Sequence, residues 1–249
     1  MIYGIISIME RIDDLQLKGL RLIQNPALFC FGTDAVLLAD FAEVKKGERV
    51  ADFGTATGVL PLLLYGRQED ASYYGLEIQQ ALYEIAVRNV ALNGLENRVS
   101  IFKGDIKAAA SVLGRGYDVV VVNPPYEKEK DGLARGSACH RIARKEVLIT
   151  LDGILAAAGE VLKSGGRLYM IHKASRLPEI FYKMKEQRIE PKILRLVQAR
   201  EGAEPKYALI CGMKDAAEHL IVRPPLVLED GDGNETQEVM RIYNRERQE

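Results

Sequence analysis

The sequence predicts an α/β fold, with a seven-stranded and mostly parallel sheet that has helices on both faces. From Glu48 onward, short runs rich in β-branched residues alternate with longer segments of helical periodicity, a pattern typical of a parallel sheet covered on both sides. The chain has 249 residues and 47% of them are hydrophobic, so it can bury a substantial core. We therefore expect a single domain over residues 1–249.

The seven expected strands are short apolar runs bounded by polar or turn residues. Their β-branched and aromatic content favours strands over short helices. In chain order they are RVADF, SYYGLEI, VSIFKG, YDVVVV, GRLYMIH, KILRLVQA and KYALICGM, at residues 49–53, 72–78, 99–104, 117–122, 166–172, 192–199 and 206–213.

Two of the intervening helices have an apolar stripe at helical spacing. Segment 79–94 should bury one side and end at Asn93-Gly94. Segment 145–166 should bury one side and end at Gly165 or Gly166. We interpret both stripes as core contacts. The first consists of Leu82, Ile85, Ala86 and Leu92, and the second of Val147, Leu151, Ile154, Leu155, Ala158, Val161 and Leu162.

Both ends of the chain are expected to be additions to the central sheet. Residues 1–45 form an extension that begins with the apolar segment MIYGIISIMERIDD, which lacks a basic leading region and is too short to span a bilayer. We interpret this segment as a strand or packing arm, not as a signal peptide or membrane anchor. Residues 229–249 are expected to be a loosely held tail, whose Asp and Gly residues lack the spaced glutamate of a calcium loop.

Charge and cysteine content exclude several classes of protein. The 34 Lys and Arg residues nearly balance the 35 Asp and Glu residues, so any surface that binds nucleic acid must be a local patch. Cys30, Cys139 and Cys211 are odd in number, far apart and without C-x-x-C spacing, which argues against a disulfide framework or a zinc site. We expect three reduced thiols in a cytoplasmic protein that binds no metal.

The segment DFGTATG follows the first strand of the sheet and predicts a ligand-binding turn. Gly54 and Gly58 bracket a tight turn from strand to helix, where the backbone can approach a ligand and the helix N-terminus favours a negative charge. The fingerprint for a dinucleotide would need glycine at Ala56, so a nicotinamide cofactor is disfavoured. Glycine at a strand end can also serve packing alone.

Acidic residues end the next two strands. In open α/β sheets ligands bind at the carboxyl ends of the strands, where Glu77 could accept hydrogen bonds from two ribose hydroxyls. Asp105 could accept from an adenine amino group, while Ile78 and Ile106 could flank the ring. The alternative is that these carboxylates are solvated or cap helices.

The strand YDVVVV ends abruptly at Asn123-Pro124-Pro125-Tyr126. Proline cannot donate to a sheet ladder and it pushes the preceding residue away from helical geometry, so this segment must leave the sheet as a stiff, extended turn. A rigidly held amide followed by an aromatic ring is therefore expected at this strand end.

The segments DFGTATG, GLEI, GDI and NPPY, in this order between Asp52 and Tyr126, resemble class I S-adenosylmethionine-dependent methyltransferases that modify amino groups. The resemblance implies a Rossmann-like sheet and S-adenosyl-L-methionine as cofactor. The segments FCFGTDAVLLADFA (29–42) and ARKE (143–146) further resemble the bacterial tRNA adenine-N6 methyltransferases that modify position 37 of a valine tRNA. Ala56 replaces the glycine usual in that family, and Lys145 stands where histidine is common.

The resemblance also implies which residues form the site. Asn123 and Pro124 would present a side-chain oxygen and a carbonyl to the amine of the target base, preorganised by the two prolines. Tyr126 would stack on a base swung out of its helix. No metal or covalent nucleophile is needed. The residues implied in cofactor binding are Asp52, Gly54, Thr55, Gly58, Glu77, Ile78, Asp105, Ile106 and Asn123.

The segment after Tyr126 is longer than most loops and rich in basic residues, so we expect it to contact an RNA backbone. A solvated loop is the alternative. We expect RNA, specifically tRNA, as the partner, no contact with a membrane, and a monomer. The basic residues are Lys128, Lys130, Arg135, His140, Arg141, Arg144 and Lys145, of which the last four and Arg135 are the expected substrate contacts.

Other functions share the NPPY segment. It also fits enzymes that methylate guanine N2 in rRNA, adenine in DNA or a protein glutamine; the absence of a large N-terminal recognition domain disfavours the last two. A different class is an RNA-binding protein that has lost catalysis. Such a protein would be expected to have lost Asn123 or Glu77, and both are present.

Overall fold

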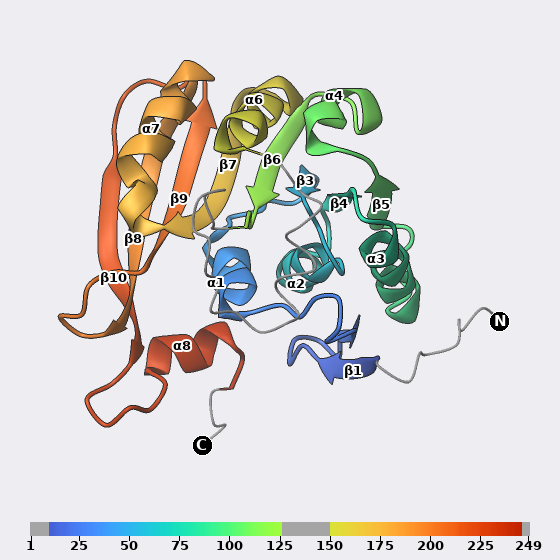
Figure 1. Ribbon diagram of the computed structural model, residues 1–249, viewed down its shortest axis with the longest axis horizontal. Coiled ribbons are helices and arrows are strands. Elements are labelled where there is room, and N and C mark those ends of the chain that lie inside the picture. The colour runs from blue at the N-terminus through green and yellow to red at the C-terminus, as the bar shows by residue number, and fades with distance from the viewer. Residues whose placement is uncertain (1–9, 126–149, 246–249) are drawn as a thin grey trace.

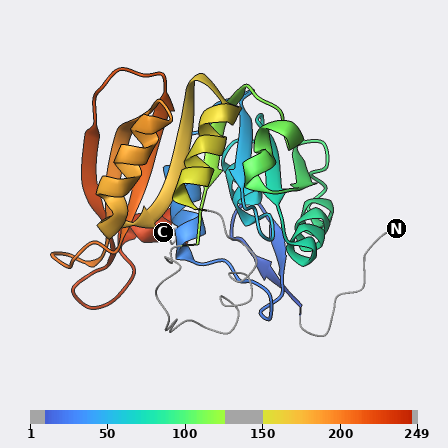
Figure 2. The same ribbon diagram turned by 45° about the horizontal axis from the view of Figure 1, so that its top comes forward.

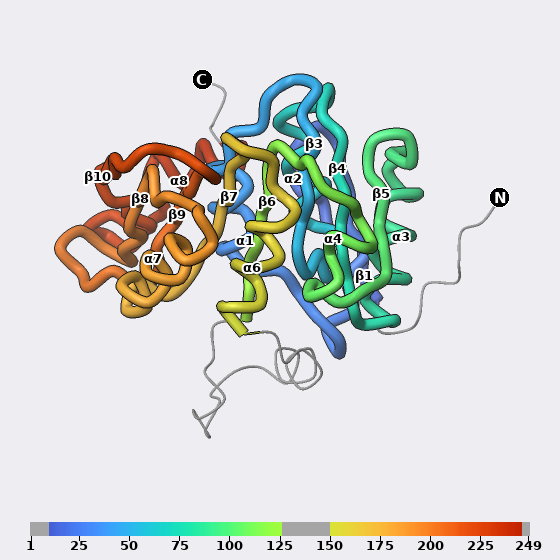
Figure 3. The backbone as a smooth tube through the Cα atoms, turned by 90° about the horizontal axis from the view of Figure 1, so that it is seen from above, coloured from blue at the N-terminus to red at the C-terminus, as the bar shows by residue number. Residues whose placement is uncertain are grey.

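An eight-stranded sheet crosses the protein. The structure is a computed structural model and describes residues 10–125 and 150–245. Its sheet has the order β10-β8-β9-β7-β6-β3-β4-β5, which is seen from left to right in Figure 3. Within it β9 is antiparallel to both neighbours and the other pairs are parallel. The strands are β3 (Arg49–Phe53), β4 (Ser72–Glu77), β5 (Val99–Lys103), β6 (Tyr117–Val122), β7 (Leu162–Lys173), β8 (Ile189–Arg200), β9 (Tyr207–Lys214) and β10 (Ile221–Glu229).

The predicted fold class is confirmed, and the seven predicted strands are all present. The additional strand is β10, which forms one edge of the sheet, contains Pro224 and Pro225, and is not among the predicted strands. Proline is tolerated at an edge, where one side of the strand needs no partner, and the register with β8 shifts between Arg223 and Leu226. The sheet therefore has eight strands instead of seven.

Helices cover both faces of this sheet. The helices α4 (Ala109–Val112), α6 (Leu151–Val161) and α7 (Leu177–Glu186) lie on one face, as Figures 1 and 2 show. The helices α1 (Thr33–Phe41), α2 (Val59–Arg67), α3 (Gln80–Leu92) and α8 (Gln237–Ile242) lie on the other. Two short 3-10 turns, η1 (Ile106–Ala108) and η2 (Ala174–Arg176), follow β5 and β7. None of the helices in the described ranges is long and apolar enough to cross a bilayer.

The run of four valines in β6 shows why a continuous apolar sequence suits this sheet. Val119 and Val121 belong to the core beneath α1 and α2, whereas Val120 and Val122 belong to the core beneath α4 and α6. Successive side chains of a strand point to opposite faces, so a central strand covered on both sides must be apolar at every position.

Two helix predictions need correction, one in its C-terminal end and the other in its buried side. The helix α6 ends at Val161, because Leu162 is extended (φ −66°, ψ 139°) and begins β7, so Gly165 and Gly166 lie within a strand. The helix α3 ends at Leu92 before Asn93, as expected, but Leu92 is only half-buried. The buried side of α3 continues instead through Asn89 and Val90.

The N-terminal extension begins, in its described part, with a small hairpin of β1 (Arg11–Asp14) and β2 (Arg21–Gln24). The expected strand is thus present at residues 11–14, whereas residues 1–9 lie outside the described residues. The segment FGTDA leads into α1, which begins at Thr33.

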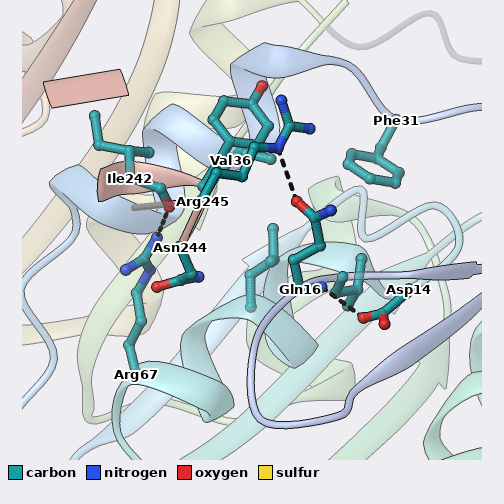
Figure 4. A pocket seen from close by; sticks show the side chains of 11 residues that line it. Asp14, Gln16, Phe31, Val36, Arg67, Ile242, Asn244 and Arg245 are labelled. Carbon is teal, nitrogen blue, oxygen red and sulfur yellow. Dashed lines mark hydrogen bonds between the residues drawn. The ribbon is translucent and has the colours of Figure 1, made fainter. Parts of the chain in front are cut away.

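The tail was expected to be loosely held. Residues 230–235 are exposed, whereas the helix α8 that follows them is packed on one side. The Thr236 hydroxyl accepts a hydrogen bond from the Val239 N–H at 3.3 Å and caps α8, whose Val239 and Ile242 are 3% and 2% exposed. Figure 4 shows the pocket between this segment and the rest of the chain. There Arg245 Nε donates to Gln16 Oε1 at 2.8 Å, and Arg67 donates to the Ile242 carbonyl at 3.0 Å. Two buried apolar side chains therefore anchor a segment that its Asp and Gly content suggested was free.

Candidate functional site

Four predicted motifs meet at one edge of the sheet. Phe53 of β3 is level with Leu76 of β4 and with Val122 of β6, so the residues that come directly after these three in the chain are neighbours. These are Gly54, Glu77 and Asn123. One strand further, Glu77 is paired with Lys103 of β5, and Asp105 follows two residues later. The chain passes from β3 outward to β5 and then returns to the other side of β3 with β6, which makes this edge a topological switch point, the usual ligand site of open α/β sheets.

The turn after β3 needs residues that tolerate left-handed backbone geometry. Gly54, Ala56 and Gly58 have φ angles of 73°, 49° and 80°. The two glycines adopt this region without a steric penalty, whereas an alanine there is strained. This geometry explains why glycine is the usual residue at position 56 in the family that the sequence resembles. A Cβ atom on Gly58 would also lie 3.4 Å from the Cβ of Ala86 on α3.

Hydrogen bonds hold this turn, residues 54–58, which we call the cofactor loop after the role that the resemblance implies for it. The N–H groups of Gly54 and Thr55 both donate to the Leu76 carbonyl, at 2.9 and 3.0 Å. The Gly58 N–H donates to the Thr55 carbonyl at 2.8 Å. The Ala56 N–H donates to Glu77 Oε2 at 2.9 Å. The loop is thus bound to the end of β4 at three consecutive residues.

Glu77 has a second role that the sequence did not indicate. Its side chain is only 3% exposed, and Oε1 accepts from the Gln79 N–H at 2.8 Å while Oε2 accepts from Ala56. Burial raises the pKa of Glu77, and the backbone N–H groups of Gln79, Ala56 and Ile78 oppose that rise. A carboxylate has about four acceptor positions, so Glu77 can shape the loop and still accept from ribose hydroxyls.

Three buried polar side chains, one just before the loop and two within it, lack partners among the described residues. Neither carboxylate oxygen of Asp52 makes a hydrogen bond within the described residues, and the hydroxyls of Thr55 and Thr57 also make none. These residues are 1%, 2% and 0% exposed. Buried polar groups are nearly always hydrogen-bonded in proteins, so this cluster indicates a place for a polar ligand or ordered water.

Burial raises the pKa of Asp52 to about 7. The nearby Thr55 hydroxyl lowers this pKa, although it makes no hydrogen bond of ordinary geometry with the carboxylate, and the negative charge of Glu77 raises it. A positively charged ligand would favour the ionised form of Asp52.

The two isoleucines and Asp105 differ in how accessible they are. Ile78 is 39% exposed, which is unusual for a large apolar side chain, whereas Ile106 is 8% exposed. The Cδ1 of Ile106 lies 3.9 Å from the position that a Cβ on Gly54 would take, so the side chain reaches the cofactor loop. Asp105 is half-buried, and its Oδ1 caps η1 by accepting from the Lys107 N–H at 2.9 Å. One carboxylate oxygen of Asp105 thus caps a helical turn, which was the alternative interpretation, and the second oxygen can still accept from a ligand.

The described part of the NPPY segment directly follows β6 and has no regular secondary structure. Asn123 is half-buried, Pro124 is buried and Pro125 is exposed. The segment ARKE lies outside the described residues. So do the other residues expected to contact substrate, which are Tyr126, Arg135, His140, Arg141, Arg144 and Lys145.

Two residues near the site were missed in the sequence. Thr57 has the buried hydroxyl noted above, and Asn89 of α3 donates to the Thr57 carbonyl at 2.9 Å. The signal for Asn89 was present: it continues the apolar stripe of Leu82, Ile85 and Ala86 at helical spacing, where a polar residue must find buried partners. No such signal distinguishes Thr57.

Comparisons with known proteins agree with this geometry. Residues 20–186 match the model of the methyltransferase small domain family. The chain is 30% identical to the tRNA1(Val) (adenine(37)-N6)-methyltransferase of Porphyromonas gingivalis over 204 residues, which are 79% of this chain and 79% of that protein. The protein of the same description from Bacteroides thetaiotaomicron is 30% identical over 196 residues, 78% of this chain and 81% of that one.

Solved structures share the fold. A predicted O-methyltransferase from Agrobacterium tumefaciens has a TM-score of 0.69 at 23% identity, covering 86% of this chain and 96% of that chain. The TYW2 protein of M. jannaschii, crystallised with AdoMet, has a TM-score of 0.57 at 13% identity, covering 86% of this chain and 88% of that chain.

Proposed function

We propose that this chain, which belongs to the methyltransferase small domain family, methylates N6 of an adenosine in tRNA, at position 37 of a valine tRNA. It is an S-adenosyl-L-methionine-dependent N-methyltransferase. The observation that carries the proposal is that Gly54, Glu77 and Asn123 are neighbours at the switch point of the sheet, which puts a ligand-binding loop beside an amide able to meet an amine. Relatives named for this tRNA modification support the substrate.

The buried polar groups fit the cofactor. S-adenosyl-L-methionine supplies an electrophilic methyl group on a sulfonium, which is a good leaving group. We assign Asp52 and Thr55, whose side chains lack protein partners, to the polar amino-acid part of the cofactor. The cofactor loop from Gly54 to Gly58 lets the backbone approach it closely.

We assign the nucleoside part of the cofactor to the ends of β4 and β5. Glu77 accepts from the ribose hydroxyls, and the second oxygen of Asp105 accepts from the adenine amino group. Ile106 packs on one face of the adenine ring from within the core, and the exposed Ile78 covers the other face. The unusual exposure of Ile78 is accounted for by a ring that buries it when the cofactor binds.

Asn123 and Pro124 act on the acceptor amine. An exocyclic adenine amine is a poor nucleophile because its lone pair is delocalised into the ring. The Asn123 side-chain oxygen and the Pro124 carbonyl accept hydrogen bonds from its two N–H groups and favour a more tetrahedral nitrogen. The buried Pro124 holds these acceptors in place before the substrate arrives, which is electrostatic preorganisation.

We assign Tyr126 to stacking with the flipped base. The basic residues Arg135, His140, Arg141, Arg144 and Lys145 hold the RNA backbone. The proposal includes a monomeric enzyme that forms one domain over residues 1–249 and acts in the cytoplasm.

The test is methyl transfer from labelled cofactor to purified tRNA, rRNA, DNA and protein fractions, followed by nucleoside and amino-acid analysis. The expected product is N6-methyladenosine in the tRNA fraction. N2-methylguanosine in rRNA, methyladenine in DNA or methylglutamine would identify one of the alternative substrates instead. A valine tRNA transcript with guanosine at position 37 is the matched control and should accept no methyl group. A chain that binds tRNA but not S-adenosyl-L-methionine would be a non-catalytic relative.

A further inference from the structure

We propose that Asn89 is a positioning residue for the cofactor loop and couples the β1–β2 hairpin to it. The inference rests on the proposed function, because the loop is taken to hold the cofactor. Asn89 lies on α3 and is completely buried. Its Oδ1 accepts from the Ile23 N–H at 2.6 Å, and its Nδ2 donates to the carbonyls of Ile23 and Thr57 at 3.0 and 2.9 Å. Both amide hydrogens are therefore in use, one toward the hairpin and one toward the loop.

Asn93, the C-cap residue of α3 and one turn after Asn89, repeats the contact with the hairpin. Its Oδ1 accepts from the Arg21 N–H at 2.9 Å, and its Nδ2 donates to the Arg21 carbonyl at 2.8 Å. Four residues of a helix span about 6 Å along its axis, and two residues of a strand span about 6.8 Å. Side-chain amides four residues apart on a helix can therefore reach alternate residues of a neighbouring strand. The two side chains thus pair with the edge of β2 that faces away from β1, as a third strand would.

The two asparagines differ in where the second amide hydrogen goes. Asn93 donates to the carbonyl of Asn89 in its own helix, at 2.7 Å. Asn89 donates to Thr57, inside the cofactor loop. The hairpin lies beside α3 on the side of the sheet that also carries α2, which begins where the loop ends (Figures 1 and 3). Asn89 therefore joins three parts of the chain, whereas Asn93 joins two.

The bond to Thr57 fixes a peptide plane of the loop. In a trans peptide the C=O and the following N–H point in opposite directions. Asn89 holds the Thr57 carbonyl on the α3 side, and this turns the Gly58 N–H toward the Thr55 carbonyl, which it meets at 2.8 Å. Ala86 packs against Gly58 from the same side of α3. Loss of the Asn89 amide would release this plane, and the loop would have to be ordered again when the cofactor binds.

The matched variants are Asn89→Ser and Asn93→Ser. Both remove the pairing with β2, but only Asn89→Ser also releases Thr57. Cofactor affinity by calorimetry should fall about tenfold in Asn89→Ser and stay within about twofold of the parent in Asn93→Ser. In steady state the cofactor KM of Asn89→Ser should rise while kcat at saturating cofactor is retained. Val161→Ala, in the core of the opposite face, controls for a general loss of stability and should leave cofactor affinity unchanged.

Hydrogen exchange on the parent protein gives a test that does not depend on a variant folding. Cofactor should slow exchange of the Arg21 and Ile23 amides, because both are held by α3, and leave the edge strand β10 unaffected. The inference is overturned if these amides are indifferent to cofactor, or if Asn89→Ser and Asn93→Ser bind cofactor equally well. A parent that binds no S-adenosyl-L-methionine would instead overturn the proposed function, and this inference with it.

Discussion

The Glu77 carboxylate accepts a hydrogen bond from the Ala56 N–H at 2.9 Å, so the side chain proposed to bind the ribose also shapes the cofactor loop. We expect Glu77→Ala to weaken cofactor binding by about 1.5–3 kcal/mol, the value of hydrogen bonds to a charged acceptor. Because Ala56 and Gln79 also lose their acceptor, the melting temperature should fall as well. Glu77→Gln keeps the shape and should lower stability less. Unchanged affinity by calorimetry in both variants would remove Glu77 from the site.

The buried carboxyl of Asp52 should make the stability of the cofactor-free protein depend on pH. Its pKa is raised from an ordinary value of 3.8 to about 7, so between these values the folded chain holds a proton that the unfolded chain has lost. The free energy of unfolding should therefore fall as pH rises through this window, by a total on the order of 4 kcal/mol.

Urea denaturation of the parent and of Asp52→Asn at pH 5 and pH 8 measures this effect. The amide resembles the protonated acid, so the variant should be the more stable protein at pH 8. Its free energy of unfolding should also lack the decrease with rising pH that Asp52 causes in the parent. It should also bind the positively charged cofactor less tightly at pH 8. Parallel pH profiles for the two proteins would show that Asp52 is not the titrating group.

The strained backbone of Ala56 predicts that glycine is tolerated there better than at an ordinary position. A φ of 49° destabilises an alanine by about 1 kcal/mol, and Ala56→Gly removes this strain. Part of the gain is offset because glycine has more conformational freedom in the unfolded chain to lose on folding. We expect Ala56→Gly to range from neutral to about 1 kcal/mol more stable, and Ala56→Val to be clearly less stable. If Ala56→Gly destabilised the protein as much as an alanine-to-glycine change does in a helix interior, Ala56 would not be strained. Denaturant titration of the three proteins decides.

Asn123 provides the direct test of the chemistry. Asn123→Ala should still bind cofactor, because the cofactor loop and Glu77 provide most of the proposed contacts, and should lose methyl transfer by about two to three orders of magnitude, the range found when one preorganised polar contact is removed. Asn123→Asp keeps an acceptor and should retain more activity than the alanine variant. Single-turnover rates and melting temperatures are measured on the same preparations. A lower melting temperature with full turnover would mean that Asn123 only caps the turn before Pro124.

The sheet could be predicted because its signals are local. The run Val119–Val122 and the motif at each strand end are readable without knowing the neighbours, and parallel pairing then places the strand ends together. What failed depends on distant partners. Strand β10 contains Pro224 and Pro225, and only its edge position makes them acceptable. The tail looks polar in sequence, yet Val239 and Ile242 are buried because they pack against residues that are distant in the chain.

The candidate site divides in the same way. Glycines at positive φ and acids at strand ends are visible in sequence, whereas the paired roles of Glu77 and Asn89 arise from hydrogen bonds to backbone groups of other segments. Nearly every residue carries the same backbone N–H and C=O, so the identity of a residue does not show which distant side chain its backbone will bind. Asn89 could be noticed only as a polar residue on an apolar stripe, without indication of its partner.

The packing of α8 has a consequence for how the protein is made. Arg245 bonds to Gln16, 229 positions earlier in the chain, and Ile242 lines the same pocket as Val36 and Leu63. During synthesis from the N-terminus, the apolar surface of α1 and α2 in this pocket is translated long before the residues that cover it. This surface stays uncovered until residues 236–245 have been synthesised, and uncovered apolar surface promotes chaperone binding or self-association. Completion of this part of the fold therefore depends on the synthesis of α8, about 200 residues after α1.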